Sequence, residues 1–190
     1  MDRKTRHELI QQKQAEDSIR QEFEGTLPLR AARYLQVKPH PIVPYEHFSA
    51  ASAECSLLFR DGHFYGCIAL TQAVAEALVK FLCERNSWKP VKTFEKNVEK
   101  LLARNIISDK LKESLLRIWE RRDDYHHLNP AVKTVRQELE QLAREKARLL
   151  AEVESELFRF VITDGKIILG EPKYWKKSGD QVIVDLRLDP

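Results

Sequence analysis

The sequence is poor in the residues that interrupt helices or cross-link small folds. Its 190 residues include 6 glycines, 8 prolines and 3 cysteines, while 43% are hydrophobic. This composition argues against disorder throughout and favours helix over strand. The cysteines, Cys55, Cys67 and Cys83, have no CxxC spacing and fall within helical apolar patterns. They therefore predict buried thiols in a reducing compartment and no structural zinc site.

The chain also lacks a long unbroken apolar run and a strong excess of one charge. The segment MDRKTRHELIQQKQAEDSIRQ has no apolar core of the kind that a signal peptide needs, and the stretch CIALTQAVAEALVKFL is interrupted by Gln72, Glu76 and Lys80. The 32 basic and 29 acidic side chains leave a net charge of +3, too little for a global field that attracts nucleic acid. We therefore expect a cytoplasmic protein without a membrane span, in which any RNA site is a local patch.

The apolar patterns divide the chain into three predicted parts. Residues 1–43 are expected to form a polar helix that ends near Gly25, followed by an extended, proline-rich connector. Residues 44–157 have the helical periodicity of a bundle. Residues 158–190 change to the alternation of strands, so we predict a small β appendage. The fold class is therefore mainly α: a four- to five-helix up-and-down bundle with an N-terminal helix and a C-terminal antiparallel β-meander.

Apolar spacing and turn signals set the limits of the bundle helices. Pro44 is tolerated in a first turn, so a helix should begin around Pro44 to His47, Asp61-Gly62 provides its stop, and Ser108 or Asp109 can cap a later helix. The predicted helices run over about 47–61, 63–84, 94–101, 109–126 and 130–157. The last has near-heptad apolar spacing and could project or pair with another chain.

The C-terminal part has the signature of a hairpin. FRFVIT and KIILG flank Asp164-Gly165, a preferred two-residue turn, and VIVDLRL is a candidate third strand. Because so small a sheet needs a hydrophobic surface to rest on, we expect it to pack on the bundle or on a second copy.

The segment RRDDYHHLNP contains the candidate chemistry. Leu111, Leu115, Ile118, Arg122 and His126 step by four, three, four and four residues, so a continuous helix would place Arg122 on its inward stripe. A guanidinium there needs an anionic partner. Either the carboxylate of Glu76 or a substrate phosphate could serve.

A second group in this segment can exchange protons. Pro130 disfavours helical geometry at Asn129, so the helix should end near His127 and free its imidazole to lie beside Arg122. Asp123, four residues before His127, could accept its hydrogen bond and favour the imidazolium form. An arginine and a titrating histidine that converge in a cleft could perform phosphodiester chemistry without a metal.

The arrangement Arg122-Asp123-x3-His127 resembles the Arg-polar-x3-His motif of the HEPN superfamily of helical ribonucleases. The resemblance extends over roughly Pro44 to Leu157, and LLFRDGHFYGCIALTQAVAEALVKFL is similar to the first helical pair of that family. It implies that Arg122 binds the scissile phosphate, that His127 acts as general base or acid, and that Asp123 supports them. The implied reaction is metal-independent RNA cleavage by the 2′-hydroxyl, without a cofactor. The implied partners are RNA, a second copy of the chain and, for a toxin, an antitoxin protein.

Other interpretations stay open at this point. Arg121 and His126 have the same spacing as the preferred pair, and Arg122 could serve only as a structural ion pair with Glu76. His126 is expected to be a helix-end residue that supports the site together with Glu76 and Asn129. A metal site built from Asp123, Asp124, His126 and His127 is not expected, because adjacent residues point in different directions.

Two further hypotheses concern what the segment binds. Arg117, Arg121 and Lys133 could form a local patch that follows the phosphates of an RNA strand. Alternatively, the chain is a catalytically silent module of the same fold that binds a protein or a nucleotide through the same cleft.

Overall fold

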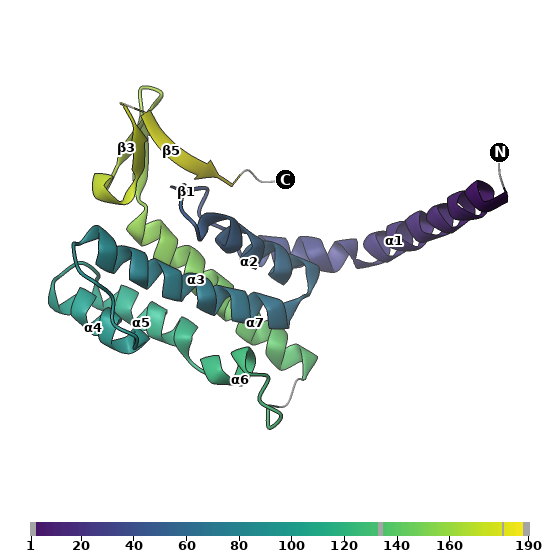
Figure 1. The fold of residues 1–190 in the computed structure, drawn as a ribbon, viewed down its shortest axis with the longest axis horizontal. Helices are drawn as coiled ribbons and strands as arrows, with labels where there is room; N and C mark the ends of the chain where they lie inside the picture. Colours follow the sequence, from purple (N-terminus) through teal and green to yellow (C-terminus); the bar gives the residue numbers. More distant parts are fainter. Residues whose placement is uncertain (1–2, 133–134, 180, 188–190) are drawn as a thin grey trace.

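The computed structural model describes residues 3–132, 135–179 and 181–187, and Figure 1 shows a helical body with a long N-terminal helix and a small group of strands. The predicted mainly helical fold with a small antiparallel sheet is confirmed. The helices are α1 (Arg3–Gln36), α2 (Ser49–Asp61), α3 (Phe64–Arg85), α4 (Phe94–Ala103), α5 (Asp109–Trp119), α6 (Arg122–His126), α7 (Arg136–Leu157) and the short η1 (Pro172–Tyr174). The strands are β1 (Ile42–Pro44), β2 (Phe160–Thr163), β3 (Lys166–Leu169), β4 (Lys176–Ser178) and β5 (Gln181–Leu186).

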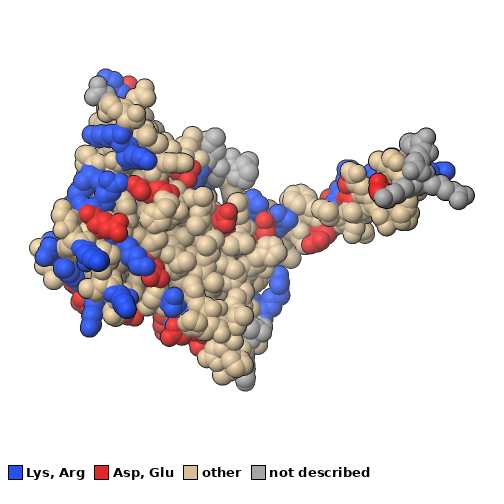
Figure 2. All heavy atoms as spheres, viewed as in Figure 1, with Lys and Arg blue, Asp and Glu red and all other residues tan. Residues whose placement is uncertain are grey.

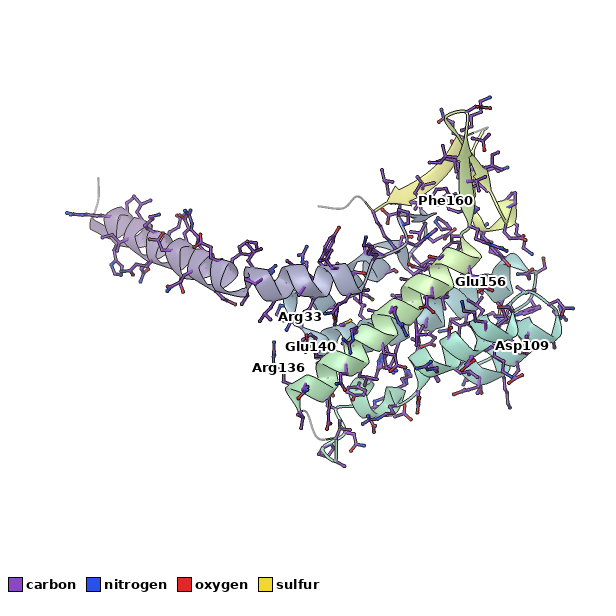
Figure 3. The ribbon with its side chains drawn as sticks, turned by 180° about the vertical axis from the view of Figure 1, so that it is seen from behind. Arg33, Asp109, Arg136, Glu140, Glu156 and Phe160 are labelled. Atoms are coloured by element: carbon purple, nitrogen blue, oxygen red, sulfur yellow. The ribbon has the colours of Figure 1, made fainter. Side chains whose placement is uncertain are left out.

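Helix α1 is longer than predicted, and the expected end near Gly25 is wrong. The helix continues through Gly25 and Pro28 to Gln36, so most of the predicted extended connector is helical. Tertiary contacts outweigh the local signals, because Arg33 binds Glu140 of α7 with Nε 2.7 Å from Oε1. Figure 3 shows these two side chains facing one another at the crossing of α1 and α7. Figure 1 shows that the N-terminal part of α1 projects away from the body.

The turn between α2 and α3 requires glycine. Gly62 has a φ of 81°, in the left-handed region, and ends α2 as predicted. A Cβ at this position would also lie 3.0 Å from the guanidinium nitrogens of Arg33 and Arg136. The turn therefore brings α2, α3 and the beginning of α7 close to α1.

Helix α3 is the centre of the bundle and packs against α2, α4, α5, α6 and α7. Within the described residues it is the one helix long and apolar enough, by length and composition, to span a membrane. This is weak evidence for a span, because 61% of its apolar window is buried and the central helix of a bundle passes the same test. All three cysteines are buried and free, as predicted.

Helix α7 is the second long element of the core. It begins at Arg136 rather than near Pro130 and lies along α3 and α5, so it does not project. Opposite its C-terminal half, Ser108 caps α5 as predicted, with its Oγ accepting a hydrogen bond from the Leu111 amide at 3.1 Å.

The C-terminal strands form two small groups. Strands β2 and β3 make the predicted hairpin around Asp164-Gly165. The predicted third strand is present as β5, but it pairs with β4 and with β1, which comes from the segment before the bundle. Arg187, at the end of β5, donates to Glu154 of α7 with Nη1 2.6 Å from Oε2, and this buried pair ties the sheet to the bundle.

Candidate active site around helix α6

The helix that was predicted to run to His126 is interrupted before the motif. Helix α5 ends at Trp119, Glu120 is extended (ψ 137°), and Arg121 has a φ of 60°. A second, short helix, α6, then begins at Arg122. The prediction of a continuous helix is therefore wrong, and the motif occupies a separate helical turn that packs on α3.

The break is fixed by two buried side chains from other helices. The ammonium of Lys146, 1% exposed on α7, donates to the carbonyl oxygens of Arg117, Ile118 and Glu120 at 3.1, 2.7 and 2.9 Å. The Nε2 of Gln72 on α3 donates to the Glu120 carbonyl at 3.1 Å. These donors satisfy carbonyls that a continuous helix would have bonded internally, and the positive charge lies at the negative end of α5. We call Lys146 and Gln72 the α5 clamp.

Arg122 lies on an aromatic stack. Its guanidinium carbon is 4.8 Å from the ring centre of Trp119, and that ring stacks on Phe94 at 4.2 Å. Its Nη1 is 3.4 Å from Oδ1 of Asp123, and its side chain is 28% exposed. The stack holds the stem while the terminal nitrogens reach the surface, an arrangement that suits an arginine meant to bind an anion.

His127 meets the same carboxylate oxygen as Arg122. Its Nε2 is 3.8 Å from Oδ1 of Asp123, and both His127 and Asp123 are largely exposed. The helix ends at His126, as the proline signal predicted, and the His127 amide donates to the carbonyl of Asp123 at 3.3 Å. The structure thus brings Arg122, Asp123 and His127 together at an accessible surface.

His126 faces the other way, toward α3. Burial is the main cause that lowers its pKa, and the charge of Arg122 adds to this, while a hydrogen bond with the backbone of Ala69 acts in the opposite direction. Its Nε2 is buried without a partner among the described residues. His126 is therefore a partly buried neighbour of Arg122 that disfavours a charge.

The alternative arginine, Arg121, has a different environment. Its Nε is 3.0 Å from Oδ2 of Asp124, and its guanidinium lies 5.5 Å from the ring centre of Tyr125. Asn129 donates to the other oxygen of Asp124 at 2.9 Å. The bonds from Asn129 and Arg121 lower the pKa of the Asp124 carboxyl. Asn129 and Asp124 thereby support α6 from its C-terminal side.

The remaining predicted residues lie apart from this group. Glu76 pairs with Lys80, Nζ to Oε1 2.6 Å, so the suggested ion pair between Glu76 and Arg122 does not form. It is still close enough to His126 to raise the pKa of that imidazole slightly. Arg117 points to α7 and pairs with Glu145, away from α6. Lys133 lies outside the described residues.

A cleft of about 460 Å³ borders the motif between the start of α4 and the α5–α6 junction. Lys92, Arg121 and Arg122 supply its positive charge, and four carboxylates also line it. The carboxylates are those of Glu95, Glu120, Asp123 and Asp124. Within the described residues no group of three or more His, Cys, Asp or Glu side chains is placed to hold a metal ion. Its four carboxylates outnumber its three cations, so the cleft has no net positive charge.

Sequence reasoning missed the α5 clamp, although a signal for it was present. Lys146 lies four residues after Leu142 and three before Leu149, on the inward stripe of α7, where a lysine needs buried acceptors. Gln72 was visible as a polar interruption of the apolar α3. The sequence did not reveal that both side chains bind the same carbonyl.

Comparisons with protein-family models, with curated proteins and with solved structures find no significant match to this chain.

Proposed function

We propose that the protein is a metal-independent endoribonuclease of the HEPN type, with Arg122 and His127 as its catalytic residues. The observation that supports this most directly is their common neighbour: Arg122 Nη1 and His127 Nε2 lie 3.4 and 3.8 Å from one Asp123 oxygen. A phosphate oxygen that replaced that carboxylate oxygen would meet a guanidinium N–H and a proton-transfer group together.

The proposed reaction uses these positions as follows. His127 takes the proton of a ribose 2′-hydroxyl as its oxygen attacks the adjacent phosphorus. Arg122 stabilises the charge that builds up on the phosphoryl oxygens. The bond from phosphorus to the 5′-oxygen breaks, that oxygen gains a proton from water or from a second copy's acid, and a 2′,3′-cyclic phosphate remains. Asp123 orients the imidazole before RNA binds.

A homodimer through α3 would complete such a site. The accessible surface of α3 includes Tyr65, Gly66, Ala69, Ala73 and Ala77, which are exposed or half-buried, and it ends at the Glu76–Lys80 ion pair. Figure 2 shows that the middle of this face of the molecule is almost free of charged side chains. A largely uncharged run of small residues beside the motif favours a second copy as its partner, so that two motifs border one groove.

The test is cleavage of structured RNA in excess EDTA by the wild type, Arg122→Ala and His127→Ala. His7→Ala and Arg20→Ala, exposed residues on the projecting helix, are matched controls. We expect fragments ending in cyclic phosphate from the wild type and the controls, and at least 100-fold slower cleavage by the two motif variants.

Equal cleavage by the motif variants, or none by the wild type with varied RNAs, would contradict the proposal. The second result would favour a silent module that binds a protein or a nucleotide. Within the proposed function, a toxin role would add an antitoxin partner, which would be recognised because it abolishes the cleavage.

A further inference from the structure

A second pocket lies at the other end of α5 from the motif. It has a volume of about 430 Å³. It is bounded by the end of α3, the α4–α5 loop, the end of α7, and η1 with the residue before it. Helix α5 separates the two sites, and its 11 residues span about 16 Å. Figure 2 shows lysine and arginine side chains gathered at the side of the molecule where α4, α5 and the strands lie.

Three exposed cations line this pocket: Arg104, Arg159 and Lys173. Arg104 rests on the ring of Trp88, with its guanidinium carbon 4.4 Å from the ring centre. Among the described residues, none of the three cations forms an ion pair with a carboxylate. Because an aromatic face does not neutralise the charge or use up the N–H donors in the guanidinium plane, Arg104 remains available to an anion.

Neighbouring groups fix the ammonium of Lys173 and the backbone of Arg159. Lys173 donates to Oδ1 of Asn86 at 2.9 Å, and Asn86 in turn donates to the carbonyl of Leu82 at 2.7 Å. The Gly170 amide donates to the Arg159 carbonyl at 2.8 Å. A Cβ at Gly170 would lie 3.1 Å from that oxygen, so the close approach suits a glycine. The pocket is thus built from chain segments that the fold fixes relative to one another.

The acidic residues of the pocket do not cancel its charge. Three cations face two carboxylates, so the pocket keeps one net positive charge. Glu156 is half-buried and accepts a hydrogen bond from the Ser108 hydroxyl at 2.6 Å. Glu171 is exposed and lines the pocket beside the cations, so it can accept hydrogen bonds from a neutral donor. The combination of three cations and one exposed carboxylate suits a ligand with a phosphate and hydroxyl donors.

We propose that this pocket binds a ribonucleotide, with Arg104 and Arg159 on its phosphate and Glu171 on its ribose hydroxyls. The nucleotide is either free or part of an RNA strand whose backbone the pocket holds. Binding here requires no cleavage, so the inference is independent of the proposed reaction at α6.

The test is calorimetric titration of the full chain with adenosine 5′-monophosphate, with adenosine, and with an RNA oligonucleotide, every protein carrying His127→Ala so that the proposed reaction at α6 cannot cleave the strand. We expect Arg104→Gln/Arg159→Gln to weaken binding at least tenfold. For the oligonucleotide, the variant should lower the slope of log affinity against log salt by about 1.4, because two phosphate contacts are lost. Arg6→Gln/Arg20→Gln removes the same charge from exposed positions on α1 and should bind like the wild type.

The ligands separate the two sources of the phosphate. If the monophosphate binds as tightly as the oligonucleotide, the result supports a free nucleotide as the ligand. If only the oligonucleotide binds tightly, it supports an RNA backbone. The proposal fails if neither binds, if adenosine binds as well as its monophosphate, or if both double variants lose the same affinity. If the Arg104/Arg159 double variant unfolds, the two single variants provide the same comparison.

Discussion

At the scale of single residues, the two histidines of the motif have opposite environments. His127 is 70% exposed beside Asp123, whereas His126 is partly buried beside Arg122 and α3. A buried imidazole next to a guanidinium resists protonation. The neighbouring histidines therefore have different environments: His127 is the accessible one that the proposed reaction uses, and burial and Arg122 lower the pKa of His126.

This difference predicts a titration result. In the wild type, the His126 ring should titrate below pH 6.5, and Arg122→Ala should raise its pKa, because the variant removes a positive charge that lowers it. NMR shifts of the imidazole protons against pH measure both values, with His7 on the exposed helix as the internal control. Titration of His126 at or above pH 6.5 in the wild type would contradict the described packing.

The same shift has a consequence for stability. Because the folded chain binds a proton at His126 less readily than the unfolded chain, the free energy of unfolding should decline as the pH falls below 6.5. Above that pH both states are neutral at this residue and the effect disappears.

At the scale of elements, the α5 clamp determines where the motif lies. Lys146 is buried among carbonyl oxygens, and burial lowers its pKa to about 8. Its N–H groups donate to carbonyl oxygens at the end of α5, among them that of Glu120, so that the chain can turn through Arg121 into α6. The position of Arg122 thus depends on a side chain 24 residues farther along the sequence.

We expect Lys146→Met to lower the free energy of unfolding by about 3 kcal/mol at pH 7, since it leaves buried carbonyls without donors. The wild type should also gain stability between about pH 8 and 10.5, where the unfolded lysine keeps a proton that the folded one has lost, and the variant should not. Chemical denaturation measures both effects. Lys13→Met, an exposed lysine of α1, is the control and should change stability by less than about 0.5 kcal/mol.

Sequence signals predicted some elements and failed for others, for physical reasons. The end of α2 at Gly62 and the β2–β3 turn were predicted because a left-handed glycine and an Asp-Gly turn act locally. The continuation of α1 through Pro28 and the break after Trp119 depend on contacts between distant residues. Arg33 with Glu140 and Lys146 with the α5 carbonyls decide these boundaries, and periodicity contains no information about such pairs.

At the scale of the whole molecule, apolar periodicity was sufficient to predict a bundle around α3. It could not assign the partners of β5, because strand pairing between distant segments leaves no local pattern. The candidate site was predicted in part. Asp123 contacts Arg122 and lies 3.8 Å from His127, too far for the hydrogen bond expected between them, whereas Glu76 and Arg117 belong to other ion pairs.

The proposed homodimer gives a prediction at this scale. Ala73→Glu places a carboxylate on the exposed apolar face of α3 and should convert a dimer into a monomer, because an unpaired charge in an apolar interface is costly. Sedimentation velocity reports the change in mass, and circular dichroism should show an unchanged helix content. Ala15→Glu, on the projecting α1, is the matched control.

A wild type that is monomeric at all accessible concentrations would exclude the α3 dimer. An Ala73→Glu protein that remains dimeric would move the interface to another surface.

The pairing of β1 with β5 sets an order on the folding of the chain. Val43 lies opposite Asp185, so this contact joins residues 142 positions apart. Closing so long a loop is entropically costly until the intervening helices have drawn its ends together, and during synthesis it must wait until residue 185 has left the ribosome. We therefore expect the bundle to form first and the strands to close over it last, so that a nascent chain could present the α6 motif before its sheet exists.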